Sequence, residues 1–136
     1  MSQLDRFKFR VWFEGRFIYK SLCDSNVYTK DNKCICLANT LPNLPWEQCT
    51  GLKDKNGELI YEADIVSKEF TDRPFSSKAK SKIKNCLIYW NNGACAFSLK
   101  YKSDDYRYYS VHHNNAFCDC EIVGNIHTDK KLLDFS

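Results

Sequence analysis

The chain has 136 residues, of which 43% are hydrophobic and 15% aromatic, with a single Met. A chain of this length can bury an ordinary core without disulfides or a metal, and its aromatic-rich composition favours strands over helices. The formal net charge of +3 is too small for a dedicated DNA-coating protein. The net charge therefore excludes a dedicated DNA-coating protein and does not indicate which partner the chain binds.

A hairpin is the first predicted element. Apolar residues at alternate positions from Phe7 to Phe13 predict a strand with one apolar face, and Glu14-Gly15 predicts a tight turn into a second strand at residues 16–20. The charged residues around this hairpin do not resemble a signal peptide, and no window has the length of a membrane-spanning helix. We expect a soluble protein in the cytoplasm that does not bind a membrane.

Irregular segments follow the hairpin. Residues 34–38 predict a short buried strand, and Pro42 and Pro45 mark an extended link because proline interrupts backbone hydrogen bonding. Asn56-Gly57 predicts a reversal because these residues tolerate positive φ. A single strand is predicted at residues 59–66.

A Ser/Lys-rich loop is predicted at residues 76–84, which lack apolar anchors. Further strands are predicted at residues 85–90, 94–101, 106–111 and 120–126, the first two joined at Asn91-Asn92-Gly93. Near the end, Asp129 is expected to cap one helical turn that docks Leu132 and Leu133. Short strands at close spacing predict a mainly β fold, a barrel or a twisted antiparallel sheet, with irregular loops and at most short helical turns.

Eight cysteines raise the question of a metal. Two Cys-x-Cys pairs, Cys34/Cys36 and Cys118/Cys120, could each present two sulfurs on one strand face. Zinc could use both pairs, or one pair with His112, His113 or His127. The spacing lacks the two-residue knuckle of common zinc modules, so the favoured interpretation is reduced thiols that fill small core positions, with no cofactor.

Two other classes of chemistry receive little support. Glu62 and Asp64 share strand parity and could form a carboxylate pair for a divalent metal or for hydrolysis, but no nucleophile, phosphate loop or histidine partner occurs at a recognisable spacing. The favoured role of Asp64 is to accept hydrogen bonds at a strand start, with Glu62 solvated. His112 and His113 would face opposite ways on a strand, and nothing marks an activated cysteine. We expect no catalytic residue.

Nucleic-acid binding has two candidate features. One is the spaced lysine series, which could follow phosphates, and the other is a segment where aromatic and basic residues alternate, as stacking surfaces require. The residues are Lys78, Lys80, Lys82 and Lys84 in the first, and Tyr101, Lys102, Tyr106, Arg107 and Tyr109 in the second. The structural alternatives are a solvated loop and a strand packed on both faces.

Three stretches carry a family resemblance: FKFRVWFEGRFIY, QCTGLKDKNGELIYEADIV and EIVGNIHTDKKLL. In this order and spacing they resemble the landmarks of the YopX protein family. The landmark residues expected to be structural are Gly51, Asn56, Gly57, Asp64, Gly124 and Asn125. The chain departs from the family pattern at Ala63, where Gly is usual, and at His127 and Lys130, where Tyr and Pro are usual. We interpret Ala63 to mean that this position does not need a backbone conformation reserved for glycine.

The resemblance implies a bacteriophage or prophage protein containing a small SH3-like barrel, with no activity to transfer. Residues 1–136 would form one domain, with a small N-terminal lobe at 1–45 and a barrel core at 46–136. We expect a non-enzymatic accessory protein that binds a host protein or nucleoprotein complex, such as an anti-CRISPR-type inhibitor of a defence nuclease. Trp12, Trp46 and Tyr109 are candidate anchors because interfaces favour large aromatics. Direct nucleic-acid binding and a zinc or divalent-metal protein are the alternatives, and a homo-oligomer would cover unpaired strand edges.

Overall fold

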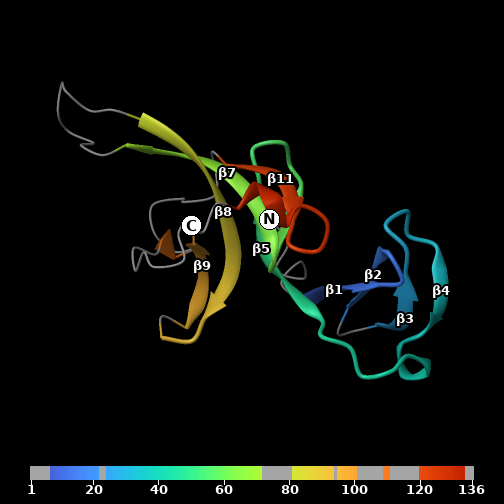
Figure 1. Cartoon of the computed structure of the whole chain (residues 1–136). Coiled ribbons are helices and arrows are strands. Elements are labelled where there is room, and N and C mark those ends of the chain that lie inside the picture. The colour runs from blue at the N-terminus through green and yellow to red at the C-terminus, as the bar shows by residue number, and fades with distance from the viewer. Residues whose placement is uncertain are drawn as a thin grey trace. The chain divides into compact units, whose positions relative to one another are not determined.

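A computed structural model describes residues 7–21, 24–71, 81–93, 95–100, 109–110 and 120–133. The chain divides into two compact units, residues 1–52 with 59–62 and residues 53–58 with 63–136, and its strands form two antiparallel sheets (Figure 1). The described helical elements are short 3-10 turns, and none of the helices in this part is long and apolar enough to cross a membrane. The mainly β prediction is confirmed, as two open antiparallel sheets.

A six-stranded sheet in the order β4-β3-β2-β1-β5-β6 belongs to the first unit. Its elements are β1 (Lys8–Phe13), β2 (Arg16–Ser21), β3 (Asp24–Tyr28), β4 (Cys34–Leu37), the 3-10 turn η2 (Ala38–Thr40), β5 (Glu47–Lys53) and β6 (Leu59–Tyr61). Glu14 and Gly15 join β1 to β2 with φ of 53° and 80°. Two successive positive φ angles suit the two-residue hairpin turn that follows strand twist, so the predicted hairpin is confirmed.

One face of this sheet carries a core. Val11, Ile18 and Val27 are fully buried, and the register places Val11 opposite Ile18. Partly buried hydrophobic residues pack against them: Phe13, Cys36, Ala38, Leu41, Leu44 and Trp46. The irregular segment around Pro42 and Pro45 thus supplies Leu41, Leu44 and Trp46 to the core, and its prediction as a link without regular structure is confirmed.

Residues 34–37 form the predicted strand, but the prediction that it is buried was wrong. Ile35 is 40% exposed and Leu37 46% exposed, and Cys34 is also exposed. The reason is topological, because β4 is the last strand of its sheet and pairs with β3. Cys36 is the β4 residue that packs against the core.

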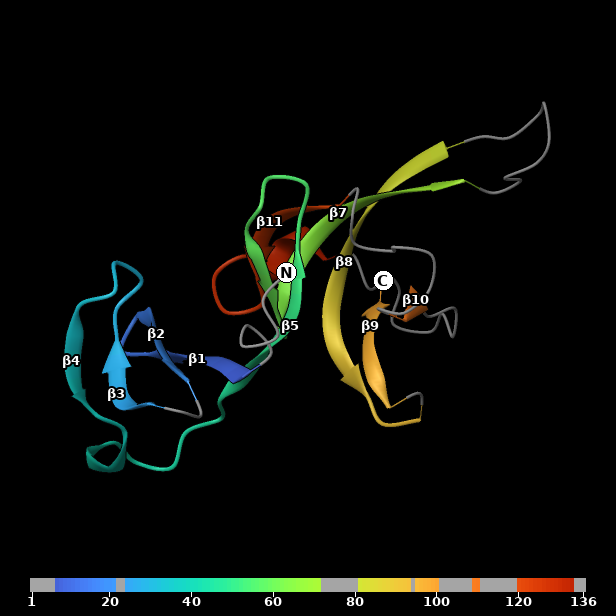
Figure 2. The ribbon, with the colours of Figure 1, turned by 180° about the vertical axis from the view of Figure 1, so that it is seen from behind.

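The second unit contains a five-stranded sheet in the order β10-β9-β8-β7-β11 (Figure 2). Its elements are β7 (Asp64–Thr71), β8 (Ser81–Asn91), β9 (Ala96–Lys100), β10 (Tyr109–Ser110), β11 (Glu121–Asn125) and the 3-10 turn η3 (Lys130–Leu132). The predicted β8–β9 hairpin is confirmed, since Asn91 pairs with Ala96. The loop prediction was wrong for residues 81–84, because they pair with residues 68–71 of β7.

Ala63 divides the segment that the sequence predicts as one strand at residues 59–66. β6 ends at Tyr61, Ala63 has a φ of 71°, and β7 begins at Asp64. The Ala63 N–H donates to the Ile88 carbonyl at 2.8 Å, and the Ala63 carbonyl accepts from the Ile126 N–H at 3.0 Å. The interpretation that Ala63 avoids a glycine-type conformation was therefore wrong, because two hydrogen bonds hold this residue in the left-handed region.

The end of the second unit differs in detail from its prediction. β11 confirms the strand predicted at residues 120–126, and η3 confirms a single helical turn. The Asp129 side chain does not cap η3, because its carboxylate accepts from Asn125 N–H and Thr128 Oγ1 instead. Leu133 is buried as expected, whereas Leu132 is 39% exposed.

Ala63→Gly should stabilise the protein. Left-handed backbone costs an L-residue about 1–2 kcal/mol, and the extra chain entropy of glycine offsets part of that gain. We expect the free energy of unfolding to rise by about 1 kcal/mol in urea denaturation. Ala96→Gly, in a paired strand without positive φ, is the control and should lower it; a loss of stability in Ala63→Gly would contradict the assigned backbone.

Candidate functional site

The strands β7 and β8 extend beyond their neighbours. β9 pairs with residues 87–91 of β8, and β11 pairs with residues 64–67 of β7. Residues 68–71 and 81–84 therefore pair with each other alone among the described strands, and both ribbon views show them running side by side (Figures 1 and 2). We call residues 67–71 with 81–85 the basic ribbon.

Lysines face each other across this ribbon. Lys68 is the direct cross-strand partner of Lys84, and Lys82 follows two residues from Lys84, opposite Phe70. Direct partners have Cβ atoms about 4.5–5.5 Å apart and share a face, and like charges in this position destabilise a sheet. Both lysines also act electrostatically on the thiol of Cys86. The ribbon thus gathers positive charge at an energetic cost to the fold.

The charge of the chain is concentrated in the stretch of sequence that begins and ends with the two strands of the ribbon. Residues 67–85 hold six basic and two acidic residues, a net charge of +4, whereas the whole chain carries +3. The remaining 117 residues therefore carry −1 in total. The small net charge of the whole chain therefore does not reveal that residues 67–85 are strongly basic.

Apolar groups are also exposed along β8. Ile83 is 72% exposed and lies opposite the exposed Glu69, on the face of the ribbon away from Lys68 and Lys84. At the other end of β8, Trp90 is 44% exposed and packs edge-on against Phe97, with ring centroids 5.1 Å apart. β8 therefore offers both cationic and apolar groups to a partner.

The predicted binding residues are only partly within the described chain. Lys82 and Lys84 lie on β8, and Tyr109 lies on β10 opposite Leu99. Outside the described residues are Lys78, Lys80, Tyr101, Lys102, Tyr106 and Arg107, and also Cys118, His112 and His113. Trp46 belongs to the first unit, where its half-buried ring packs against the core and lies 4.5 Å from Lys20 Nζ.

Lys68 was missed by the sequence reasoning. The reason is that Lys68 is 16 positions from Lys84, and only the β7–β8 register brings the two together. Extending the predicted strand beyond residue 66 and pairing it with residues 81–87 would have found it.

The central landmark motif is organised by one carboxylate. Asp54 is 6% exposed, and its Oδ1 accepts from the N–H groups of Asn56 and Glu58 at 2.9 and 3.0 Å. Its Oδ2 accepts from the Ile122 N–H of β11 at 3.0 Å. The Asp54 carboxylate thus fixes the turn, which Gly57 completes with a φ of 83°, and ties it to a distant strand.

Other landmark residues also have backbone roles. Gly51 has a φ of 82°, and Asp64, at 2% exposure, starts β7 opposite Asn125. A Cβ on Gly124 would lie 2.6 Å from Asp129 Cβ, which is closer than real Cβ contacts allow, so only glycine fits. These landmark residues therefore determine the path of the backbone.

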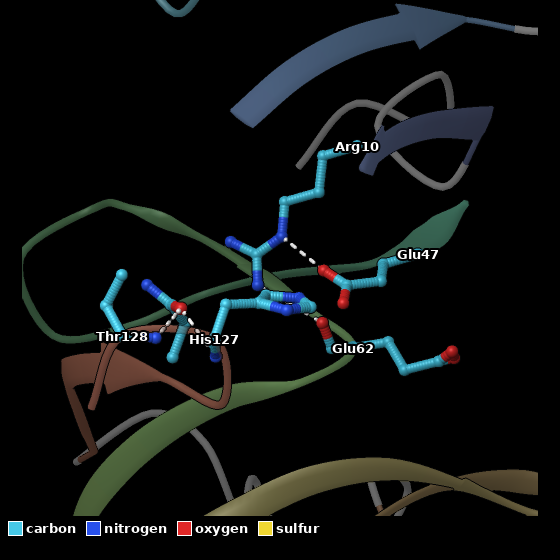
Figure 3. Close-up of polar contacts among 6 residues, drawn as sticks. Arg10, Glu47, Glu62, His127 and Thr128 are labelled. Atoms are coloured by element: carbon cyan, nitrogen blue, oxygen red, sulfur yellow. Dashed lines mark hydrogen bonds and ion pairs between the residues drawn. The ribbon is translucent and has the colours of Figure 1, made fainter. Parts of the chain in front are cut away.

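Asn125 organises the loop after β11. Its Oδ1 accepts from the N–H groups of His127 and Thr128 at 3.0 and 3.1 Å (Figure 3). Its own N–H donates to Asp129 Oδ2 at 3.1 Å. The terminal landmark is therefore a loop closed on itself by side-chain acceptors.

A buried ion pair lies in the first unit. Arg10 is 5% exposed, and its Nε lies 3.0 Å from Glu47 Oε1, while its Nη2 donates to the Glu62 carbonyl at 3.2 Å (Figure 3). The guanidinium carbon also lies 4.1 Å from the centroid of Phe17 and 4.8 Å from that of Tyr61. An ion pair, a carbonyl and two aromatic rings thus surround the charge of Arg10, which is typical of a structural contact.

Glu62 lies beside this ion pair and is partly buried. Burial raises the pKa of its carboxyl, and the negative charge of Glu47 raises it further, while Arg10 lowers it. A raised folded-state pKa contributes stability that is present below the usual value and lost as pH rises through the folded value. The prediction of a simply solvated Glu62 was therefore incomplete.

The described thiols are spread over different environments. Cys49, Cys86 and Cys120 are fully buried, whereas Cys34 and Cys95 are exposed and Cys36 is half-buried. Burial is the main cause that raises the pKa of the Cys86 thiol to about 12. Within the described residues, no group of three Cys, His, Asp or Glu side chains could hold a metal ion.

These features define a small, mainly β protein whose landmark residues build turns and which carries a two-stranded basic ribbon. The chain belongs to the YopX family, because the family model described as YopX protein matches residues 8–134. The resemblance noted in the sequence is thereby confirmed over nearly the whole chain. No curated protein matches the sequence.

Asp54→Ala should destabilise the protein strongly. The substitution leaves the N–H groups of Asn56, Glu58 and Ile122 without their acceptor in a part-buried setting, and a donor that water does not reach costs about 1–3 kcal/mol when it is unsatisfied. We expect a loss of at least about 2 kcal/mol in chemical denaturation. Asp31→Ala, at an exposed turn, is the control, and equal losses in the two variants would contradict the assigned role.

Thiol labelling should separate the described cysteines. In the native protein, iodoacetamide followed by peptide mass mapping should modify Cys34 and Cys95 within the time that leaves Cys86 unmodified. Because the pKa of Cys86 is about 12, its thiolate is scarce even at about pH 9. Denatured protein should react at all sites, and rapid native labelling of Cys86 would contradict its burial.

Proposed function

We propose that this YopX-family protein is a non-enzymatic accessory protein that binds a host macromolecule through the basic ribbon. The observation that carries the proposal is the concentration of charge, with a net +4 in residues 67–85 of a chain whose total is +3. The cross-strand pairing of Lys68 with Lys84 adds to it. An anionic partner offsets the repulsion that the ribbon otherwise contains.

The stability of the ribbon supports the same role. A two-stranded ribbon is marginal by itself, and this one places like charges opposite each other and exposes 72% of Ile83. A partner that neutralises the lysines and covers Ile83 would remove both costs. Surfaces that are unfavourable in the free protein are common at binding sites.

The absence of an enzymatic role is part of the proposal. The carboxylates of Asp54 and Asp129 accept backbone hydrogen bonds, and Glu47 is paired with Arg10. The Cys86 thiol stays protonated because burial raises its pKa. These groups serve the fold, which supports a binding function rather than catalysis.

For the partner, we propose a host nucleoprotein complex in the bacterial cytoplasm, such as a nucleic-acid-guided defence nuclease that the protein inhibits. The proposal follows from the phage or prophage origin that the YopX resemblance implies. The ribbon would contact the nucleic acid held by that complex, because a basic element is repelled by an empty basic channel. Trp90 would add an apolar contact.

Direct binding of free nucleic acid is the second candidate. The specific observation in its favour is that Lys68 and Lys84 are direct partners across a two-stranded ribbon. The major groove of B-DNA is about 12 Å wide and admits such a ribbon. In this case the protein alone would bind duplexes with a steep dependence on salt.

Charge reversal in the ribbon tests the proposal. Lys68→Glu/Lys84→Glu should reduce recovery of the host partner in affinity purification at least about tenfold, because two phosphate contacts become repulsive. Lys130→Glu/Lys131→Glu changes the net charge equally at exposed positions of η3 and is the matched control. Equal recovery with the ribbon variant and the wild type would overturn the proposal.

The same variants distinguish the two candidates. If the protein binds free nucleic acid, gel shifts with purified duplex should weaken with salt, and the ribbon variant should reduce the slope of log affinity against log salt by about 2. If the partner is a nucleoprotein complex, purified duplex should bind weakly while the complex is still recovered from host extract. Binding that is independent of salt would contradict both.

A further inference from the structure

We propose that the basic ribbon contacts two components of one partner: its lysine face contacts nucleic acid, and the opposite face, formed by Glu69 and Ile83, docks on the protein that holds this nucleic acid. The inference rests on the proposed function and adds the protein component of the partner. Glu69 and Ile83 are direct cross-strand partners. The pair next to them along both strands is Lys68 and Lys84. Because successive side chains of a strand point to opposite faces, the two pairs lie on opposite faces of the ribbon.

The exposure of the Glu69–Ile83 face increases from the core toward the ribbon. Ile65, on the same face at the start of β7, is fully buried. At Asn85 the face is half-buried, and the Asn85 side chain donates to the Leu132 carbonyl of η3 at 3.1 Å. Beyond that hydrogen bond, Ile83 is 72% exposed and Glu69 is also exposed. The described part of η3 thus reaches this face at Asn85, and the Glu69–Ile83 pair lies outside that contact.

The two faces of the ribbon carry charges of opposite sign. Lys68 and Lys84 attract phosphates on one face, whereas Glu69 repels phosphates on the other. Ile83, beside Glu69, offers no hydrogen bond to a phosphate or a base edge, and as an aliphatic side chain it has no aromatic ring on which a base could stack. The Glu69–Ile83 face therefore does not match the chemistry of a nucleic acid strand.

A nucleoprotein complex offers surfaces of both signs. Its nucleic acid is negative, and the protein that holds it places Lys and Arg side chains along the phosphates. These cations would pair with Glu69, and apolar surface beside them would cover Ile83, the most exposed of the described large hydrophobic residues. The opposite charges on the two faces of the ribbon thus match the two components of such a partner.

Contact with both components would make the ribbon specific for the assembled complex. Once the lysine face is bound to nucleic acid, the Glu69–Ile83 face meets the neighbouring protein at a high effective concentration. The complex should therefore bind more tightly than either component alone. Removal of the Glu69–Ile83 contact should weaken binding to the complex without weakening the attraction of the lysine face for nucleic acid.

Site-specific photo-crosslinking of the full chain in host cells tests the assignment of the two faces. A photo-reactive amino acid in place of Ile83 should give a protein adduct whose size nuclease does not change, whereas one in place of Lys84 should give an adduct that nuclease shortens. The same replacement at Ile35, 40% exposed in the first unit, is the control and should give neither adduct. A nuclease-sensitive adduct at position 83 would place Ile83 against nucleic acid and overturn the proposal, as would a nucleic-acid adduct at position 84 with no protein adduct at position 83.

Substitutions on the Glu69–Ile83 face should have different effects on two probes. Glu69→Lys adds positive charge, so it should raise the affinity for a purified DNA duplex at low salt at least about threefold. The same variant should lower recovery of the complex from host extract at least about fivefold, because it repels the basic protein. Ile83→Ser should lower this recovery to a similar extent and leave duplex affinity unchanged.

Each substitution has a matched control at an exposed position outside the ribbon. Glu58→Lys, in the central turn, changes the net charge as Glu69→Lys does, and Ile35→Ser, on β4, removes the same apolar side chain as Ile83→Ser. Both controls should recover the complex as the wild type does. Thermal unfolding confirms that each variant is folded.

The outcomes separate this inference from the proposed function. If Lys68→Glu/Lys84→Glu loses the complex while Glu69→Lys and Ile83→Ser retain it, the inference is overturned and the role of the lysine face stands. If all of these variants recover the complex equally, both are overturned. A Glu69→Lys variant that gains affinity for the complex as well as for the duplex would show that this face also meets phosphates, which contradicts the inference.

Discussion

The left-handed turn at Ala63 is the constraint on which the arrangement of the second sheet depends. Its N–H bonds to Ile88 of β8 and its carbonyl to Ile126 after β11, so one residue fixes both neighbours of β7. The turn also starts β7 at Asp64, which sets the register that places Lys68 opposite Lys84. Two hydrogen bonds of about 1 kcal/mol each are comparable with the cost of a positive φ in alanine. The positive φ of Ala63 is thus maintained by these two hydrogen bonds, and the position of the basic ribbon follows from this turn.

Polar side chains complete this scaffold by taking up backbone donors. Asp54 joins the central turn to Ile122, although 68 positions separate the two residues. The loop after β11 uses Asn125 and Asp129 in the same way, and Asp129 fits because Gly124 has no Cβ. Residues whose chemistry could have suggested catalysis or metal binding are therefore committed to backbone geometry. This explains how a sequence with many Asp, Asn and Gly residues in its landmarks can hold a mainly β fold together.

The sequence predicted local features well and long-range features poorly. The turns at Glu14-Gly15 and at Asn91-Asn92-Gly93 were predicted correctly because their conformations depend on the residues themselves. The turn at Ala63 could not be predicted, because alanine carries no local signal for positive φ and tertiary hydrogen bonds impose it. The exposure of Ile35 depends on where β4 falls in the strand order.

In the candidate site, too, local features were predicted from the sequence and long-range features were not. Lys82 and Lys84 were recognised as a spaced series, but residues 81–84 were assigned to a loop, and their partner Lys68 was missed because no local pattern marks register. A loop would hold its lysines at variable distances, whereas paired strands hold them at fixed ones on one face. The assignment of residues 81–84 to a strand matters for phosphate binding. Lysines at fixed positions can match the spacing of phosphates, whereas lysines on a loop can only attract phosphates.

The core of the second unit and its basic ribbon thus occupy different parts of the same strands. Ile65, Val66, Ile88 and Leu99 are fully buried where β7, β8 and β9 pair, close to the Ala63 turn. Further along the same two strands, burial gives way to Ile83 at 72% exposure and to facing lysines. A strand pair anchored at one end by a core can carry unfavourable groups at the other, because the anchored half offsets their cost. The length of β8 is consistent with this arrangement: its 11 residues exceed the five of β9, and the excess includes residues 81–85, the β8 strand of the basic ribbon.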